Sequence, residues 1–304
     1  MRLDENRELF KKLLKDAAIY FDIDEEYIEK DYWVVMLLKG LFSRDIDYVF
    51  KGGTSLSKCY KIIKRFSEDI DISTSTPYEE MGPSPRDRVF KGVSRTIKET
   101  GLQIINQSKL RRSAYFNQFI CPYDSVFDDD KVEKNVIIEL AGQSPSFPIE
   151  NVFIQSFVGE YLTINNNAEV KEYGLEPFNI KTQSLIRTFV DKIYAICDYY
   201  LQGKVKRHSR HIYDLRKIIR TIQLDNSIFE LFNQVRQYRI KLPICLSVQG
   251  DTKLYNVIGD IIKSKYFKID YETITQQLLY EKVSYEECEE TLLEIYNFLK
   301  EYNL

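Results

Sequence analysis

Histidine and cysteine are scarce in this chain of 304 residues, and both shortages narrow its chemistry. Only two histidines are present, His208 and His211, so catalysis by metal ions bound to a histidine cluster is excluded. The five cysteines are scattered, odd in number and without a CxxC pair. This usage argues against a disulfide framework and against a zinc site. Candidate chemistry must therefore be sought among other side chains.

Long apolar runs are also missing. No segment approaches the length of a membrane span. The N-terminal residues, Met1-Arg2-Leu3-Asp4-Glu5, are charged and lack the apolar core of a signal peptide. We therefore expect a cytoplasmic protein with no membrane partner. The net charge of −3 is mild and conceals local asymmetry.

The pattern of apolar residues changes from mixed to helical along the chain. With 44% apolar residues, the chain can bury the cores of two domains. Periodicity predicts helices over 5–20, 24–42, 54–65 and 86–100, and strands over 48–50, 66–73, 102–107, 114–123 and 135–141. Asp128-Asp129-Asp130 reads as a hairpin turn. Later helices are expected over 182–202, 209–221, 226–238, 250–263, 271–279 and 284–301. We predict an α+β fold with domains 1–170 and 171–304.

One stretch near residue 50 carries most of the chemical information. Gly52 and Gly53 form a turn after a short strand, and the free N–H groups of the helix expected next would face an anion. Asp69 and Asp71 follow on the next strand, where alternation places both carboxylates on one face. Two such acids repel each other, whereas Mg²⁺ takes carboxylate and phosphate oxygens together. We therefore predict a metal and triphosphate site.

A third acid is expected in a metal site of this kind. Glu139 is the candidate, because it lies in the apolar segment Val136–Leu140. A lone charge in an apolar strand is costly unless it is paired or liganded. We expect Asp69, Asp71 and Glu139 to hold Mg²⁺ or Mn²⁺. The alternative is that Glu139 faces solvent or pairs with an arginine.

Hydroxyl and ammonium groups follow the glycine pair. Thr54, Ser55 and Ser57 could donate to phosphate oxygens, and Lys58 could reach a phosphate. The alternative is that Thr54 or Ser55 caps the helix and that Lys58 faces solvent.

A second polar cluster lies far along the chain and contains Lys192, Arg210 and Asp214. Arg210 and Asp214 are four residues apart, so they would form an ordinary ion pair on one helix face. Periodicity alone favours this salt bridge.

The motifs occur together in a definite order. The glycine pair followed by Asp69-Ile70-Asp71 resembles the signature of the polymerase-β-like nucleotidyltransferases. With Glu29–Trp33 upstream, and Arg187–Lys192 and Ser209–Leu215 downstream, the chain resembles the AbiEii family of nucleotidyltransferase toxins over roughly residues 29–215. The remaining C-terminal residues resemble the family only in being helical.

This resemblance implies a polymerase-β-like nucleotidyltransferase core with a mixed sheet, a helical C-terminal domain and a nucleotide held between them. It implies a metal on Asp69 and Asp71, and an essential Asp214 that is a candidate catalytic base. The implied NTP-binding residues are Gly52, Gly53, Thr54, Ser55, Ser57, Lys58, Lys192 and Arg210.

The implied reaction is metal-dependent transfer of NMP from an NTP, with release of pyrophosphate. RNA is the expected acceptor, with a tRNA 3′ end favoured, and the setting is a toxin–antitoxin or abortive-infection (phage-defence) system with a cognate antitoxin as partner. The basic segment 204–220 suits an RNA backbone, although a solvated helix face is the alternative. Nucleotidylation of a protein and a catalytically silent NTP-binding module stay open, and the Asp69/Asp71 pair disfavours the second.

Overall fold

The computed structural model describes residues 2–128 and 132–304, which form two compact units. The first unit comprises the chain up to Cys59 together with Ser67–Thr182, and the second comprises Tyr60–Phe66 and Gln183–Leu304. The chain thus enters the second unit once early and again after Thr182, further along than the boundary expected at residue 170. Asp129 and Asp130 of the expected hairpin turn lie outside the described residues.

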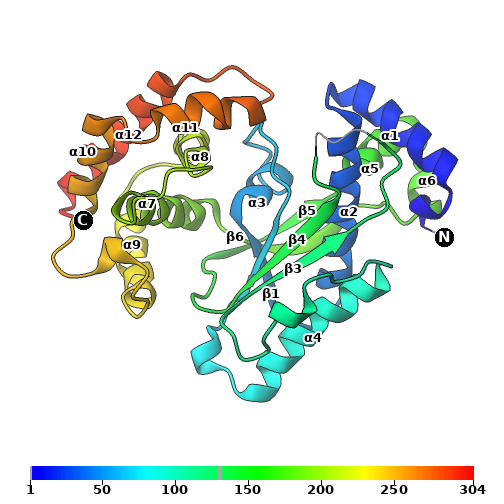
Figure 1. The fold of residues 1–304 in the computed structure, drawn as a ribbon, viewed down its shortest axis with the longest axis horizontal. Helices are drawn as coiled ribbons and strands as arrows, with labels where there is room; N and C mark the ends of the chain where they lie inside the picture. The colour runs from blue at the N-terminus through cyan, green and yellow to red at the C-terminus, as the bar shows by residue number, and fades with distance from the viewer. Residues whose placement is uncertain (1, 129–131) are drawn as a thin grey trace. The chain divides into compact units, whose positions relative to one another are not determined.

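A mixed β-sheet forms the centre of the first unit (Figure 1). Its described strands are β1 (Tyr48–Lys51), β2 (Ile70–Thr74), β3 (Phe116–Pro122), β4 (Asn135–Ala141), β5 (Ile149–Ile154) and β6 (Phe178–Gln183), in the order β3-β4-β2-β1-β6-β5. β1 is antiparallel to β2 and parallel to β6, while β4 is parallel to β2 and antiparallel to β3. The mixed sheet confirms the predicted α+β class.

The helices of the first unit are α1 (Arg7–Phe21), α2 (Glu25–Phe42), α3 (Gly52–Lys58), α4 (Pro83–Glu99), α5 (Phe157–Asn165) and α6 (Asn167–Glu172). Two expectations were wrong here. The helix expected over 54–65 ends at Lys58, because Lys61 adopts a left-handed backbone conformation and the chain then joins the second unit. Residues 102–107 form no strand, since Asn106 leads into a short 3-10 turn over Gln107–Lys109.

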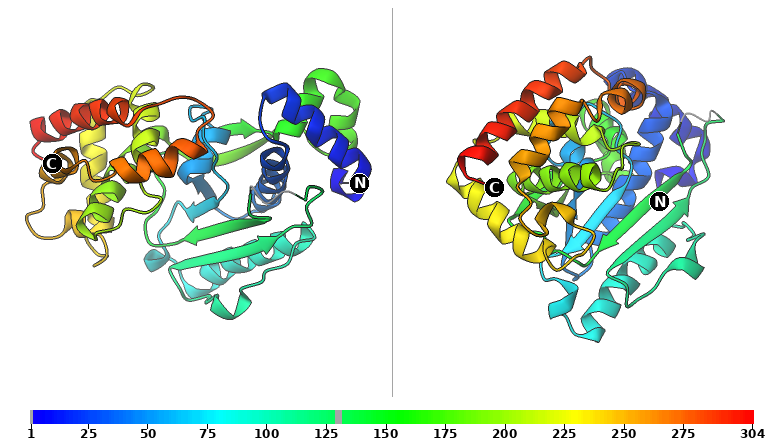
Figure 2. Two further views of the ribbon diagram at one scale, coloured as in Figure 1. Left: turned by 45° about the horizontal axis from the view of Figure 1, so that its top comes forward. Right: turned by 60° about the vertical axis from the view of Figure 1, so that its left-hand side comes forward.

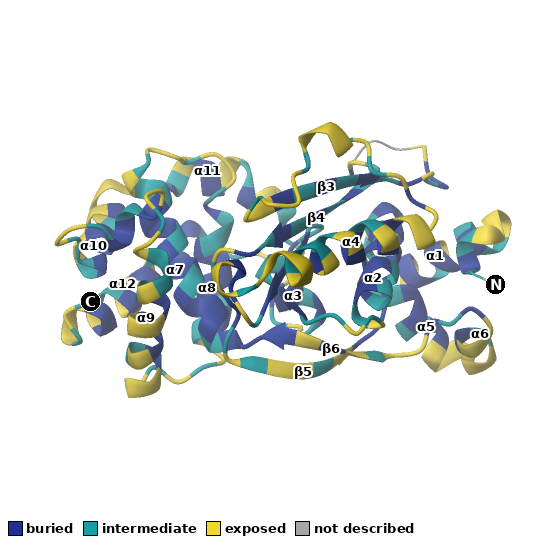
Figure 3. Cartoon of the chain, turned by 90° about the horizontal axis from the view of Figure 1, so that it is seen from below, coloured by how far each residue is buried: buried dark blue, intermediate teal, exposed yellow. Residues whose placement is uncertain are grey.

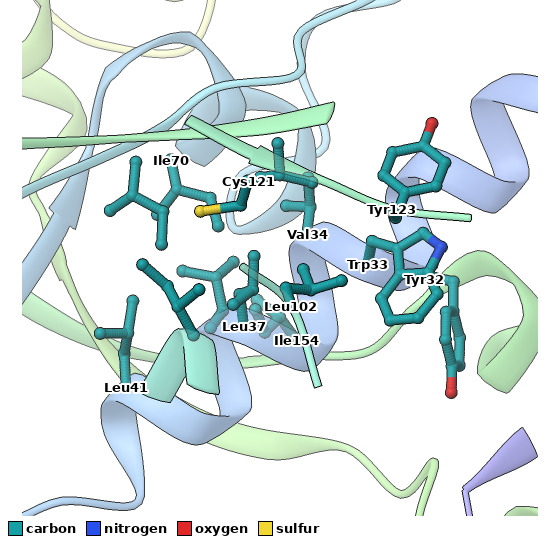
Figure 4. Packing of buried hydrophobic residues seen from close by; sticks show 14 of the residues in the cluster. Tyr32, Trp33, Val34, Leu37, Leu41, Ile70, Leu102, Cys121, Tyr123 and Ile154 are labelled. Atoms are coloured by element: carbon teal, nitrogen blue, oxygen red, sulfur yellow. The ribbon is translucent and has the colours of Figure 1, made fainter. Parts of the chain in front are cut away.

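Helix α2 packs its apolar side against the sheet. Val34, Leu37 and Leu41 of α2 lie in one buried cluster with Ile70 of β2 and Cys121 of β3 (Figure 4). The ring of Trp33 stacks on that of Tyr123, with centroids 5.7 Å apart. Val89, Val93 and Ile97 of α4 join the same cluster, so both helices cover this face of the sheet.

The second unit is helical apart from its early segment. Its helices are α7 (Leu185–Leu201), α8 (Arg210–Ile219), α9 (Asn226–Arg239), α10 (Leu254–Ser264), α11 (Lys268–Thr273) and α12 (Tyr285–Glu301). The helix expected over 271–279 was wrong, because α11 ends at Thr273 and a separate 3-10 turn covers Thr275–Leu278. Buried faces of α7, α8, α10 and α12 supply the core (Figure 3).

The early segment is held inside the second unit by its backbone. The N–H of Lys64 donates to the hydroxyl of Tyr213, and the N–H of Phe66 donates to the carbonyl of Leu278. The coil of 60–66 is visible beside α8 and α11 in Figures 1 and 2. In the described part of the chain, no helix is both long and apolar enough to cross a membrane.

Candidate active site

The glycine turn closes directly against the second aspartate of the Asp-x-Asp motif. Gly52 has a φ of +78°, which favours glycine, and a Cβ built on it would lie 1.9 Å from Oδ2 of Asp71. Lys51 is the register partner of Asp71 across the antiparallel β1–β2 pair. The turn therefore brings backbone to within van der Waals distance of a carboxylate, an approach that any larger residue would block.

Two carboxylates lie side by side on neighbouring strands. Asp71 of β2 and Glu139 of β4 are register partners in the parallel pair. Ile70, Ile72 and the neighbours of Glu139 point into the core, so the two acids project from the opposite face of the sheet. The amide of Gln118 on β3 donates to Oε1 of Glu139 at 3.0 Å.

This arrangement alters the acidity of Asp71. Burial and the negative charge of Glu139 raise its pKa to about 7, and Lys51 opposes the rise only in part. Asp69 adds a further like charge, although it precedes β2, which begins at Ile70, and so does not lie on the strand as expected. A carboxylate whose charge is disfavoured by other carboxylates is suited to a divalent cation.

The candidate metal ligands are not arranged around a common position. Within the residues that the structure describes, no three His, Cys, Asp or Glu side chains are already grouped to hold a metal ion. Asp71 and Glu139 are instead within hydrogen-bonding reach of each other. Their chemistry fits a hard cation, since all three candidate ligands are carboxylates that crowd one another. Coordination would require these side chains to separate around the ion.

The polar side chains of α3 are engaged within the first unit. Ser55 donates to the carbonyl of Gly52 at 2.8 Å, and Ser57 donates to the carbonyl of Thr54 at 2.9 Å. Thr54 shares a hydrogen bond of 3.0 Å with the hydroxyl of Ser67. These hydroxyls therefore secure the turn, one of them through the carbonyl of Gly52, and the backbone N–H groups of Gly52 and Gly53 are the groups at the turn that we still expect to face phosphate oxygens.

Lys58, the last residue of α3, is buried and does not face solvent. Its ammonium pairs with Asp31 of α2 and lies 4.0 Å above the centroid of the Phe157 ring. In this arrangement the ammonium is already neutralised in the interior, and its pair with Asp31 anchors the end of α3.

The second unit holds a buried ion cluster centred on Asp214. Asp214 is 0% exposed and accepts two bonds from Arg65, at 2.7 Å and 2.8 Å, and a third from Lys192 at 2.6 Å. The alternative salt bridge with Arg210 is not formed, because among the described residues Asp214 pairs with Arg65 and Lys192. A fully buried carboxylate needs closer neutralisation than a half-exposed arginine one helical turn away can give.

The cluster fixes the charges of its members. Burial alone would raise the pKa of Asp214, but Arg65 and Lys192 outweigh it and hold that pKa well below its usual range. Burial lowers the pKa of Lys192, and Asp214 opposes this change. His211, whose Nδ1 lies 3.3 Å from Nζ of Lys192, is kept neutral because burial and that ammonium lower its pKa. Asp214 therefore stays ionised and is a poor proton acceptor.

Several partners of these residues received no role from sequence. Arg65 belongs to the Arg65–Asp71 stretch but lies 149 residues from its partner Asp214. Lys30 pairs with Glu68, whose side chain is 33% exposed, just before β2, and Asp31 pairs with Lys58 at the end of α3. The available signal was the presence of charged residues in otherwise apolar helix positions, as at Glu29-Lys30-Asp31.

Comparison with known proteins identifies the family of this chain. No curated protein matches the chain. One crystal structure, of a candidate nucleotidyltransferase from H. pylori, aligns at 14% identity and a TM-score of 0.45, covering 92% of this chain and 96% of that one, and a likeness of this size carries no argument. The family described as "Nucleotidyl transferase AbiEii toxin, Type IV TA system" matches residues 37–290. The chain belongs to this AbiEii family of toxin–antitoxin systems and is a nucleotidyltransferase.

Proposed function

We propose that this chain transfers NMP from an NTP to an RNA acceptor, with a divalent cation, Mg²⁺ or Mn²⁺, on Asp69, Asp71 and Glu139. The observation that carries the proposal is the in-register pair of carboxylates on β2 and β4, closed by the glycine turn. Family membership supports nucleotidyl transfer itself, whereas the metal and the acceptor are our inference.

The carboxylate face carries the charge that a divalent cation would neutralise. Lys51 opposes Asp71 in the register but leaves the pKa of that carboxyl raised, so the negative charge is only partly neutralised. A divalent cation bound there would neutralise charge on the triphosphate and stabilise the transition state of in-line displacement. The backbone of Gly52 and Gly53 would bind phosphate oxygens beside it.

A basic turn in the second unit supports an RNA acceptor. Lys204, Lys206 and Arg207 are exposed in the turn between α7 and α8. The rings of Tyr199 and His208 stack beside this turn, with centroids 3.6 Å apart. Exposed cations next to aromatic rings are typical of surfaces that bind single-stranded nucleic acid.

The basic surface is smaller than the sequence indicated. Arg216 pairs with Glu287 at 2.7 Å, and Lys217 pairs with Glu281 at 2.6 Å. These two cations hold α8 to the C-terminal part of the second unit and are largely neutralised. The turn at 204–207 is therefore the part of segment 204–220 that we assign to RNA.

Incubation with each labelled NTP, Mg²⁺, total RNA and cell lysate tests the proposal. We expect label in RNA, abolished in Asp71→Asn and by EDTA. Label in protein would show that the acceptor is a protein side chain and not RNA. Binding of NTP without any labelling would show a non-catalytic NTP-binding module. A cognate antitoxin is the protein partner we infer from the family, and adding it should suppress labelling.

A triple variant tests the acceptor surface separately. Replacing Lys204, Lys206 and Arg207 by glutamine should raise the KM for RNA by roughly tenfold or more and flatten its salt dependence, because each phosphate contact adds to the salt slope. The matched control replaces three other exposed lysines of the same unit, Lys263, Lys265 and Lys300. Equal effects in both variants would assign the change to net charge and refute the local surface.

A further inference from the structure

Three consecutive charged residues in the first half of α2 have side chains that are almost fully covered. Glu29 and Lys30 are 1% and 2% exposed, and the side chain of Asp31 is 8% exposed. The same helix packs Trp33, Val34 and Leu37 into the core (Figure 4). Burying charge beside an apolar core is costly unless each group is paired, so the pairs that these residues make need a reason.

Lys30 reaches the segments that lead into both carboxylate strands. Its ammonium pairs with Glu68, the residue before Asp69, and donates to the backbone carbonyl of Glu133 at 2.9 Å. Glu133 lies just before β4, the strand of Glu139. One side chain therefore ties together the approaches to Asp69, Asp71 and Glu139.

Asp31 reaches the other half of the site. One oxygen of its carboxylate pairs with Lys58, and the other accepts from the N–H of Phe157 at 2.7 Å. Lys58 ends α3, the short helix that begins at Gly52. Asp31 therefore fixes the far end of the helix that carries the glycine turn.

Side chains at adjacent positions of a helix point in different directions, so Lys30 and Asp31 contact different partners. We propose that they are two separate positioning residues, Lys30 for the carboxylate cluster and Asp31 for the glycine turn. This inference rests on the proposed function, because it takes the carboxylate cluster as the metal site and the glycine turn as the triphosphate site. It goes beyond that function by placing the control of both in α2, outside the motifs that carry the chemistry.

The two roles predict different defects. Lys30→Met should raise the concentration of Mn²⁺ or Mg²⁺ needed for half-maximal effect by roughly tenfold or more, because the segments that lead into the ligands would no longer be tied together and ligand orientation sets metal affinity. Its KM for the NTP should change little. Asp31→Asn should raise the KM for the NTP by roughly tenfold with little change in the metal requirement, since a small displacement of a binding turn is costly. A purely structural role would shift both quantities together.

The experiment combines turnover with calorimetric titration of Mn²⁺ into the metal-free full chain. Lys39→Met is the matched control, because Lys39 lies on the same helix and donates to the carbonyl of Gly174 instead. Lys30→Arg should restore metal affinity. Should Lys30→Met fail to fold, Glu68→Gln removes the same pair at a residue whose side chain is 33% exposed and should show the same metal defect.

The outcomes separate this inference from the proposed function. Wild-type protein that neither binds Mn²⁺ nor transfers nucleotide refutes the proposed function. Wild-type protein that does both, with Lys30→Met and Asp31→Asn showing equal defects or none, refutes the positioning roles alone. Separate metal and NTP defects, with Lys39→Met normal, support them.

Discussion

Replacing Asp71 by asparagine should stabilise the metal-free protein while abolishing nucleotide transfer. Asp71 is held against Glu139 and near Asp69, and its pKa is raised from 3.8 to about 7 by burial and by these like charges. The folded state therefore resists ionisation of this group, and the unfolded state does not. Stability contributed by the protonated form is present below pH 3.8 and is lost as the pH rises through 7.

The magnitude follows from the same difference. Each tenfold change in proton affinity corresponds to about 1.4 kcal/mol, so ionised Asp71 destabilises the fold by about 2–4 kcal/mol at pH 8. An asparagine has no charge to bury and can donate a hydrogen bond to Glu139. We expect Asp71→Asn to gain about 2–4 kcal/mol in free energy of unfolding at pH 8, and less than half of that at pH 5.

The single tryptophan makes the measurement local. Trp33 lies in the core of the first unit, so its fluorescence in a urea titration reports on the unit that holds Asp71. Saturating Mg²⁺ should stabilise wild type and leave Asp71→Asn nearly unchanged. The difference in free energy of unfolding between the two proteins should therefore shrink or change sign.

Asp47, whose pKa is lowered where that of Asp71 is raised, provides the control. Burial would raise the pKa of Asp47, but hydrogen bonds from Ser75 and Lys181 outweigh it and lower that pKa. Asp47→Asn should therefore destabilise the protein at both pH values. The reasoning is refuted if Asp71→Asn is no more stable than wild type at pH 8 in EDTA, or if its gain is the same at pH 5.

Three further predictions follow from the two units. Gly52→Ala should lower the free energy of unfolding by about 3 kcal/mol or more and abolish transfer. The control, Gly250→Ala, at φ +55° with no atom near its Cβ, should lower it by only about 1–2 kcal/mol. Similar urea midpoints for the two variants would contradict the close approach of Gly52 to Asp71. Lys58→Met should destabilise the first unit, measured by Trp33 fluorescence, and should raise the KM for the NTP as Asp31→Asn does, without the loss of kcat that removing a phosphate ligand would cause. Asp214→Asn should lower stability by about 3–5 kcal/mol, measured by circular dichroism, and its residual turnover should rise as the pH falls.

Local pattern was sufficient for β4 and for the part of β2 that carries Asp71, but it wrongly placed Asp69 on the strand, which begins at Ile70. Alternation in Ile70-Asp71-Ile72 placed the isoleucines in the core and the acid on the other face, as found. Glu139 was identified because a lone acid in an apolar strand is costly. Its pairing with Asp71 could not be derived, because β2 and β4 are parallel strands brought together by packing on α2 and α4 rather than by a hairpin.

Long-range ion pairs were beyond the reach of periodicity. The spacing of Arg210 and Asp214 favoured a pair on the surface of α8, yet Asp214 is fully buried and is bound by Arg65 from 149 residues away. Lys58 likewise was expected at a phosphate or in solvent and lies against Asp31. In each case a short-range rule assumed an exposed side chain, and burial then selected a different partner.

The ion cluster of the second unit separates two explanations of why Asp214 would be essential. A general base must accept a proton near the working pH, but Asp214 is held as an anion by two cations, and its pKa lies well below the usual range. Burial lowers the pKa of Lys192, and Asp214 is the group that most strongly keeps Lys192 charged. Without that carboxylate, Lys192 would lose its proton more readily, and acid would restore it. Residual turnover of Asp214→Asn that increases toward low pH therefore supports a positioning role through Lys192, whereas turnover that increases toward high pH would restore the catalytic base.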